Sequence, residues 1–364
     1  MKRKDFKLQI IDWYIIKQFL QTFVFMIALI IAITVVFDVN EKIDAFLKPE
    51  VTLYDIAFKY YANFIPYFIG IFSPLFSFVA VIFFTSKLAD RSEIIAILST
   101  GISFNRLMVP YLLSATLIAS GNYLLSAYVI PKANVTRIDF QNTYIRNKQV
   151  QSVRNFQLEV EPGVFAYFGS YNDLSSMGYG FSLDHFEDKQ LVSRLIAASI
   201  KYDSLHQWTI IDYVIRDFDG MHERISSGSR TDTTLTFVPS DFLISESDCE
   251  TMTSPELAKH IRRQKQRGIG NIQTFEIEYH LRYATFMSFY ILTIIGLSLS
   301  SRKIKGGMGL NIGIGLGLSF AYVLFSKISS VFATSGLVSP MIAVWIPNML
   351  YVFITIFVYR QAPR

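Results

Sequence analysis

Long apolar segments dominate both ends of the 364-residue chain. An α-helix rises about 1.5 Å per residue, so about 20 apolar residues are needed to cross the hydrocarbon core of a bilayer. Six segments reach that length, and they predict spanning helices over residues 14–37, 56–85, 106–130, 282–300, 308–332 and 338–359. The second segment contains Pro66 and Pro74, so we expect that helix to be kinked or tilted.

The middle of the chain, residues 132–275, has a different pattern. Short runs of alternating residues such as "GVFAYFGSY" and "QWTIIDYVIRDF" are separated by turn-forming clusters such as "DFDG" and "SSGS". This spacing is typical of a β-sandwich or jelly roll. After the strands, "TSPELAKHIRRQKQRG" predicts a helix over about residues 255–267, with Ser254 as N-cap, Pro255 at the first helical position and Gly268 as terminator.

These patterns predict the fold class and the domain boundaries. We expect a membrane α-helical protein with six transmembrane helices and an inserted all-β, jelly-roll-like domain. Residues 1–131 hold helices one to three, residues 132–275 form the β domain, and residues 276–364 hold helices four to six. The first apolar run is too long for a signal-peptide core and no small-residue cleavage site follows it, so we expect a retained anchor.

The distribution of positive charge predicts the orientation. Short loops rich in Lys and Arg stay on the cytoplasmic side. With a cytoplasmic N-terminus, the inner segments hold most of the cations near the spans: Lys2, Arg3, Lys4, Lys7, Lys17, Lys87, Arg91, Arg106, Arg302, Lys303, Lys305, Arg360 and Arg364. The outer short loops hold only Lys42 and Lys48. We therefore expect an inner-membrane protein with both termini cytoplasmic and the β domain periplasmic.

Composition excludes several classes of function. The chain is 51% hydrophobic with a net charge of +5, but its cations cluster beside apolar spans, which argues against a nucleic-acid partner. Cys249 is the single cysteine, so an internal disulfide is excluded. The histidines lack metal-binding spacing, and neither a G-x-S-x-G nor a phosphate-binding G-x-x-x-x-G-K-[ST] motif occurs. We expect neither an enzyme nor a metal site.

A charged segment, "SKLADRSEIIAILSTGISFNR", interrupts the apolar pattern between the second and third spans. Asp90 with Glu93 three residues later forms a capping-box pattern, and Gly101 supplies a terminator, so we expect a helix over about residues 90–101. Ile94, Ile95 and Leu98 would form its apolar face. Such a helix is either a well-capped connector or a coupling helix that docks on a separate cytoplasmic motor.

Four sequence features together resemble one known family. They are "IDWYIIKQFLQTF" at the start, "RSEIIAILSTGIS" after the second span, the β insert after the third span, and "SRKIKGGMGLNIGIGLGLSFAYVLF" at the fifth. The chain resembles the LptF/LptG permease family over essentially its whole length, and is more similar to LptG. The resemblance implies the permease of an ABC exporter that takes lipopolysaccharide from the inner membrane and passes it to a periplasmic bridge.

The resemblance also implies partners and site residues. Arg91, Ser92 and Glu93, with Gly101 at the helix end, would engage an LptB-like ATPase dimer, which itself would bind ATP and Mg²⁺; this chain would need no cofactor. A second LptF/LptG-type permease would pack on the fifth span, where Gly309, Gly313 and Gly317 recur every four residues. LptC- and LptA-like jelly-roll proteins would join the edge strands of the β insert.

Basic residues near the periplasmic ends of the spans are candidates for binding the anionic lipopolysaccharide headgroup. Lys327 lies within the apolar fifth span, where an ammonium is costly; it either snorkels to the interface or faces a cavity and pairs with a phosphate. The other candidates are Lys42, Lys59, Lys132 and Arg137. Pairing with Asp38, Asp55 or Asp139 is the competing account of these four.

Two other classes of function fit parts of the sequence. A membrane-anchored sensor or scaffold would bind a ligand with its β domain and signal through the cytoplasmic helix. An ion-coupled secondary transporter fits less well, because inverted repeats and acidic residues at the middle of the spans are not apparent. The basic face of the helix at about 255–267 is either solvated or in contact with anionic headgroups. Its cations are Lys259, Arg262, Arg263, Lys265 and Arg267.

Overall fold

The chain divides into two compact units, which are described separately. The computed structural model describes residues 9–145, 152–188, 190–204, 206–220, 222–239, 242, 246–266, 272–302 and 307–362. One unit, the helical unit, comprises Met1–Ile145 and Glu276–Arg364, and the other, the insert, comprises Arg146–Phe275. The first boundary lies at residue 145 and not at the predicted 131, because the third span continues helically through α5 (Ile130–Phe140) to Ile145.

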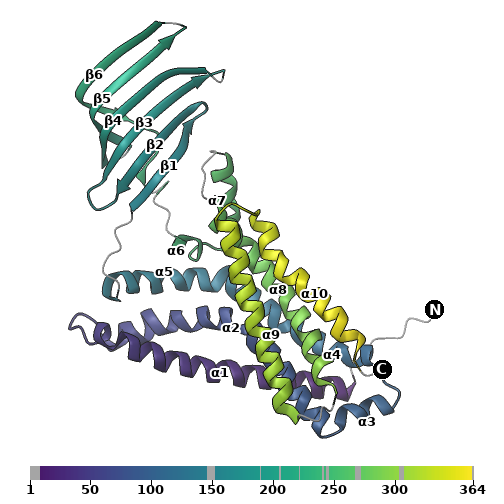
Figure 1. Cartoon of the computed structure of the whole chain (residues 1–364). Coiled ribbons are helices and arrows are strands. Elements are labelled where there is room, and N and C mark those ends of the chain that lie inside the picture. Colours follow the sequence, from purple (N-terminus) through teal and green to yellow (C-terminus); the bar gives the residue numbers. More distant parts are fainter. Residues whose placement is uncertain are drawn as a thin grey trace. The chain divides into compact units, whose positions relative to one another are not determined.

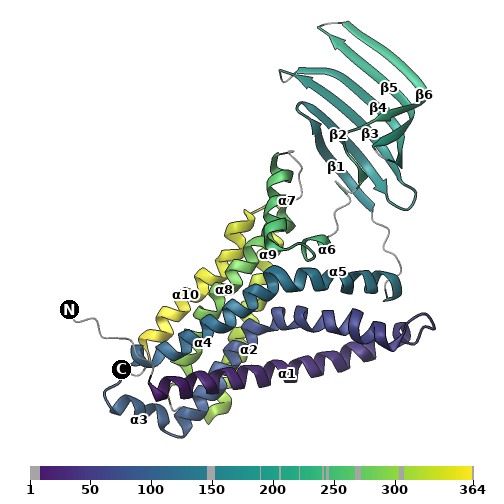
Figure 2. The same ribbon diagram turned by 180° about the vertical axis from the view of Figure 1, so that it is seen from behind.

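The helical unit contains six helices that are long and apolar enough to span a membrane, as the pattern predicts (Figures 1 and 2). The first three spans are α1 (Ile10–Phe46), η1 (Asp55–Tyr61) continued by α2 (Ala62–Asp90), and α4 (Phe104–Leu124) continued through η2 (Leu125–Val129), α5 and η3 (Gln141–Ile145). The last three are α8 (Gln273–Ser300), α9 (Gly307–Thr334) and α10 (Pro340–Arg360). Pro66 and Pro74 both lie inside α2.

Two of these helices form the centre of the helical unit. In the most apolar 18-residue stretch of the η1–α2 span, and likewise of α8, 56% of the residues are buried, against 11% in α1 and 17% in α9. Phe19, Phe84 and Tyr111 join α1, α2 and α4, and the last two rings stack with centroids 5.2 Å apart. The outer faces of α1 and α9 are therefore left for lipid or for another helix.

The insert is built on one antiparallel sheet of six strands, which confirms the predicted β domain (Figure 2). The strands are β1 (Ser152–Glu161), β2 (Val164–Asn172), β3 (Met177–Glu187), β4 (Gln190–Ser204), β5 (Gln207–Asp219) and β6 (His222–Thr234). Each pairs with the next in chain order. This order is a meander in a single sheet, whereas a jelly roll divides its strands between two sheets by Greek-key connections.

The apolar core of the insert lies on one face of this sheet. Phe156, Phe168, Phe181 and Ala197 stand opposite one another across β1 to β4. The chain after β6 covers this row with Leu235, Phe237 and Phe242. The indole of Trp208 is fully buried and donates a hydrogen bond to the Phe237 carbonyl at 3.1 Å. The described part of the chain thus fills this face with its own aromatic side chains.

Two helices follow the sheet, α6 (Glu246–Cys249) and α7 (Ser254–Gln266). The predicted helix at about 255–267 is present, but its N-cap is one residue earlier than expected. Thr253 occupies that position, and its backbone N–H donates to the Glu256 carboxylate at 2.9 Å. This pairing needs an acidic residue three positions after the cap, a spacing that Thr253 has and Ser254 lacks. Arg267 and Gly268 lie outside the described residues.

Candidate functional site

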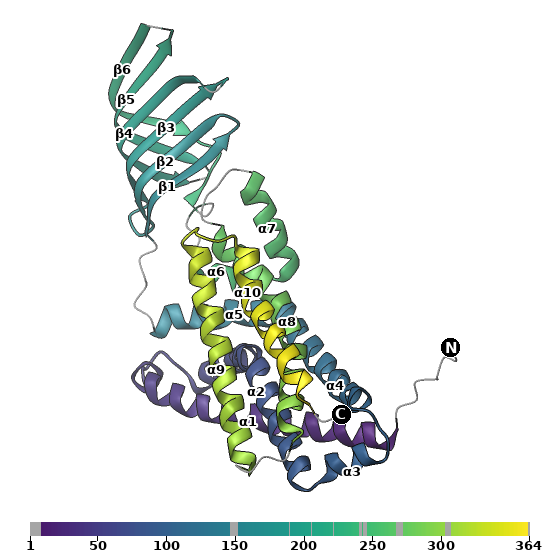
Figure 3. The ribbon, with the colours of Figure 1, turned by 45° about the vertical axis from the view of Figure 1, so that its right-hand side comes forward.

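The short helix α3 (Glu93–Ser99) connects α2 to α4 at one end of the helical unit (Figure 3). It is shorter than the predicted helix over 90–101, because α2 continues through Asp90 and buries Leu88 and Ala89 on the way. Asp90 is therefore the last residue of α2 and not an N-cap. The chain reverses at Ser92, which has a left-handed φ of 60°, and Gly101 at φ 87° ends the turn after α3 as predicted.

The faces of α3 differ from the prediction at one position. Ile94 and Ile97 are buried in the core shared by α1, α2 and α4, and Leu98 packs against it. Ile95 instead points outward and is exposed. Successive residues lie about 100° apart around a helix with 3.6 residues per turn, so a buried face centred on Ile94, between Ile97 and Leu98, turns Ile95 to the side. The outward face thus carries an isoleucine beside charged residues, which suits contact with another protein.

Glu93 at the start of α3 has partners from this same chain. The Tyr14 hydroxyl of α1 donates a hydrogen bond to its carboxylate at 3.2 Å, and the Arg91 guanidinium lies 3.9 Å away. The Arg91 side chain is 61% exposed and that of Glu93 33%. An exposed hydrogen bond of this kind contributes about 1 kcal/mol or less, so a partner's cation can replace it.

A buried ion pair beside α3 was missed by sequence reasoning. Arg106 in the first turn of α4 donates two hydrogen bonds to the Asp12 carboxylate, one of them 2.7 Å long. Asp12 is 1% exposed and also accepts the backbone N–H of Gln9 at 2.7 Å. The sequence did contain a signal for this pair: Asp12 and Arg106 carry opposite charges and lie in the first turns of two spans that start at the same side of the membrane. The pair joins the start of α1 to the start of α4.

Lys42, a predicted headgroup ligand, is paired inside the chain near the other end of α1. Its ammonium forms an ion pair with Asp38 and donates to the Tyr60 hydroxyl at 2.5 Å. Tyr60 and Tyr61 also donate to Asp38, each at 3.1 Å. The Lys42 side chain keeps 16% exposure. The competing account, pairing with Asp38, is what the structure contains, and any anionic ligand would have to share this cation.

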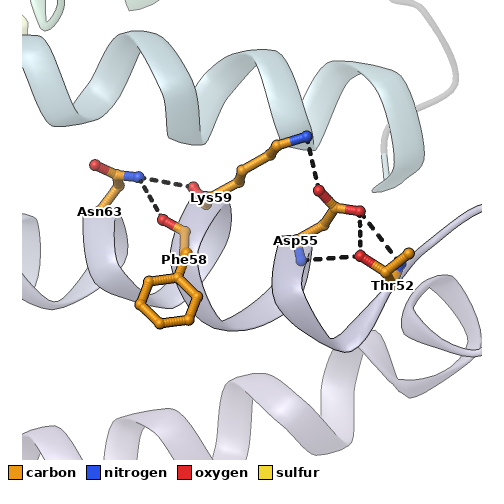
Figure 4. Close-up of polar contacts among 5 residues, drawn as sticks. All are labelled: Thr52, Asp55, Phe58, Lys59 and Asn63. Carbon is orange, nitrogen blue, oxygen red and sulfur yellow. Dashed lines mark hydrogen bonds and ion pairs between the residues drawn. The ribbon is translucent and has the colours of Figure 1, made fainter.

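Lys59 and Arg137 are also engaged by neighbours. The Lys59 ammonium lies 2.7 Å from Asp55, whose carboxylate accepts from Thr52 as well (Figure 4). This pair is on the surface, and Lys59 is 54% exposed. Arg137 is buried, donates to Asn134 at 3.0 Å and lies over the Tyr67 ring at 4.0 Å. Arg137 therefore fixes α5 on α2, whereas Lys59 can reorient toward solvent.

Lys132 and Lys327 are the candidate cations that point outward. Both side chains are exposed, and within the described ranges neither forms an ion pair. Lys327 lies on α9 among exposed apolar side chains, with Leu324, Ile328 and Val331 as neighbours on that surface. An ammonium on such a face needs the membrane interface or an anionic group nearby.

The glycines of α9 divide between two faces. A Cβ built on Gly309, Gly313 or Gly317 would meet no atom within 4 Å, so these three face open space. A Cβ on Gly315 would lie 2.1 Å from Ile82 of α2, so this glycine permits close packing within the chain. Packing inside the chain therefore explains Gly315 and leaves the predicted interface glycines exposed for another helix.

The candidate residues form separate groups and not one site. Asp12 and Lys42 are 30 residues apart on α1, which is about 45 Å along a helix at 1.5 Å per residue. That distance exceeds the thickness of a hydrocarbon core, about 30 Å. The group around α3 and the group around Lys42 therefore lie on opposite sides of the apolar part of the span.

Comparison with known families gives one match. The family model described as "Lipopolysaccharide export system permease LptF/LptG" matches residues 13–361, nearly the whole chain. The model is shared by both subunit types, so the predicted preference for LptG stays a prediction. A search of curated proteins found no match. The match covers both the helical unit and the insert, and the chain has the six apolar helices and the β insert described above. The chain therefore belongs to the LptF/LptG family of lipopolysaccharide export permeases.

Proposed function

We propose that this chain is the membrane subunit of an ABC exporter and that a separate ATPase dimer drives it. The family membership makes it a component of a transport system and not itself an enzyme. The observation that carries the finer proposal is the segment of α3 and the turn before it, which lies between two spans, exposes Arg91 and Ile95 and leaves Glu93 partly exposed. ATP and Mg²⁺ would bind to the ATPase, which would lie on the cytoplasmic side with both termini of this chain.

The contacts of α3 provide a route for movement from the ATPase to the spans. Glu93 is hydrogen-bonded to Tyr14 in α1, and Ile94 and Ile97 pack in the core that α1 shares with α4. The Asp12–Arg106 pair joins these two helices. A displacement of α3 would thus move α1 and α4 together, because a buried ion pair resists separation of its charges.

The exposed surfaces of the two units suit the other proposed partners. A second LptF/LptG-type permease would pack against the open glycine face of α9. Lipopolysaccharide phosphates would reach Lys327 and Lys132 first, since Lys42 and Arg137 already have partners. LptC- and LptA-like proteins would add strands at β1 or β6, the edges of the sheet. Because Leu235, Phe237 and Phe242 cover its apolar face, the insert would flank the lipid path.

Co-purification with an exporter's ATPase and with a second six-span protein tests the proposal. We expect Glu93→Lys to lose the ATPase, because it places a cation where the partner's cation would bind. Glu93→Gln is the matched control: it keeps the acceptor for Tyr14 and should weaken ATPase binding less. Wild-type ATPase content after Glu93→Lys would refute the coupling role. A sensor or scaffold would purify without any ATPase, and depleting it would leave newly made lipopolysaccharide correctly delivered.

A further inference from the structure

Helix α7 has one buried face and one face of cations. Leu257 and Gln264 are buried, and the Gln264 amide lies 3.4 Å from the ring of His260 on the same side. Lys259, Arg262 and Arg263 are exposed. Positions three and four apart share a helix face, so these three cations form one patch on the side away from Leu257 and Gln264. We call Lys259, Arg262 and Arg263 the α7 patch.

The α7 patch lacks counter-charges. Among the residues that the structure describes, none of its three cations forms an ion pair. Several other exposed basic residues of the insert do have acidic partners, as Arg230 has Asp232 at 3.8 Å. Like charges one turn apart destabilise a helix, and Arg263 adds to burial in lowering the pKa of His260. An anionic surface outside the protein would relieve this repulsion.

Contacts of α7 connect it to the start of a spanning helix. The His260 ring packs on the ring of Phe275 with centroids 4.8 Å apart, and Phe275 lies in the first turn of α8. The beginning of α8 is polar, and its apolar part follows Arg282. The first turns of α8 are thus suited to the boundary between water and lipid. Helix α7 itself, with 13 residues, is too short to cross a bilayer and too polar to enter it.

We propose that the α7 patch binds the phosphate headgroups of anionic phospholipids at the membrane surface. Guanidinium groups donate paired hydrogen bonds to phosphate oxygens, and the contact of His260 with Phe275 holds α7 near the residue at which the chain enters a spanning helix. The proposal goes beyond the proposed function, since it needs neither lipopolysaccharide nor an ATPase. Phospholipid phosphates are present on both sides of a membrane, so it does not depend on the orientation either.

Amide hydrogen exchange of the full chain in lipid nanodiscs tests the proposal. Discs of phosphatidylcholine alone are compared with discs that also contain phosphatidylglycerol, and exchange is followed over α7. Each cation near an anionic surface contributes about 1 kcal/mol, roughly fivefold, so three cations should slow exchange by roughly 100-fold. The protein without its three patch cations should lose this protection: Lys259→Gln, Arg262→Gln, Arg263→Gln. A control that removes the same charge from the sheet should keep it: Lys201→Gln, Arg224→Gln, Arg230→Gln.

Two further measurements test whether the protection is electrostatic and whether it requires a membrane surface. High salt should remove the protection of the wild-type protein in discs with phosphatidylglycerol, which tests the electrostatic cause even if the triple variant folds poorly. Soluble glycerol phosphate added to neutral discs should give no protection; if it does, the patch binds free phosphate and the membrane-surface proposal is wrong. Equal exchange in neutral and anionic discs would also overturn it. None of these results bears on ATPase association, so the two proposals fail independently.

Discussion

Removing Arg106 tests whether the buried ion pair holds the ends of α1 and α4 together. Asp12 is 1% exposed, so after Arg106→Ala the Gln9 N–H would be the one hydrogen-bond donor left to its carboxylate among the residues that the structure describes. Leaving one member of a buried pair uncompensated costs about 3–5 kcal/mol of unfolding free energy. Asp12→Asn should cost less, about 1–3 kcal/mol, because Arg106 is 28% exposed and can be hydrated. The asparagine also keeps an acceptor for Gln9.

Combining Asp12→Asn with Arg106→Ala tests whether the cost of Arg106→Ala comes from the buried charge of Asp12. With Asp12→Asn present, Arg106→Ala no longer leaves a buried charge, so the double variant should be more stable than Arg106→Ala alone. Equilibrium unfolding in mixed detergent micelles, followed by helical circular dichroism, measures all three. Lys59→Ala is the control: its pair with Asp55 is on the surface, so its loss should change the unfolding free energy far less than loss of Arg106. A double variant less stable than Arg106→Ala would refute the reasoning.

Other predictions separate packing within the chain from contact with partners. Gly315→Ala should cost about 1–3 kcal/mol, since the new Cβ would displace the side chain of buried Ile82, whereas Gly313→Ala meets open space and should not lower the free energy of unfolding. Gly313→Leu should instead reduce co-purification of the second permease; undiminished recovery contradicts the interface. Asn348→Leu removes a buried amide that bonds α8 and α9 and should lower stability by about 1–3 kcal/mol, read from the same unfolding curves. Burial lowers the pKa of His260 in the folded protein. The stability gained from keeping His260 neutral is therefore complete above the unfolded pKa of about 6.5 and is lost as pH falls through the lower folded pKa. The protection factor of the α7 amides, which is corrected for the intrinsic pH dependence of exchange, should then fall on acidification, and His260→Gln should abolish that fall.

The spans, the β insert and the family could be predicted from the sequence because their signals are local or repeated. About 20 apolar residues suffice to indicate a membrane helix, and alternating residues between turn clusters indicate strands. The helix terminator at Gly101 was also predictable, since a left-handed residue after a helix favours glycine. The motif "RSEIIAILSTGIS" around α3 is part of the sequence pattern that resembles the family.

The partners of individual side chains could not be predicted, because they depend on which elements pack together. Asp90 carries a good local capping signal, yet burial of Leu88 and Ala89 extends α2 through it. The sequence left Lys42 between headgroup binding and pairing with Asp38, and its contact with Tyr60 depends on the packing of α1 against η1. The sequence used Arg106 only as a charge that indicates orientation, and its pair with Asp12 depends on the packing of α4 against α1. Hydropathy is read residue by residue along the chain, but an ion pair needs two atoms within a few ångströms, and that proximity arises only when distant segments fold against each other.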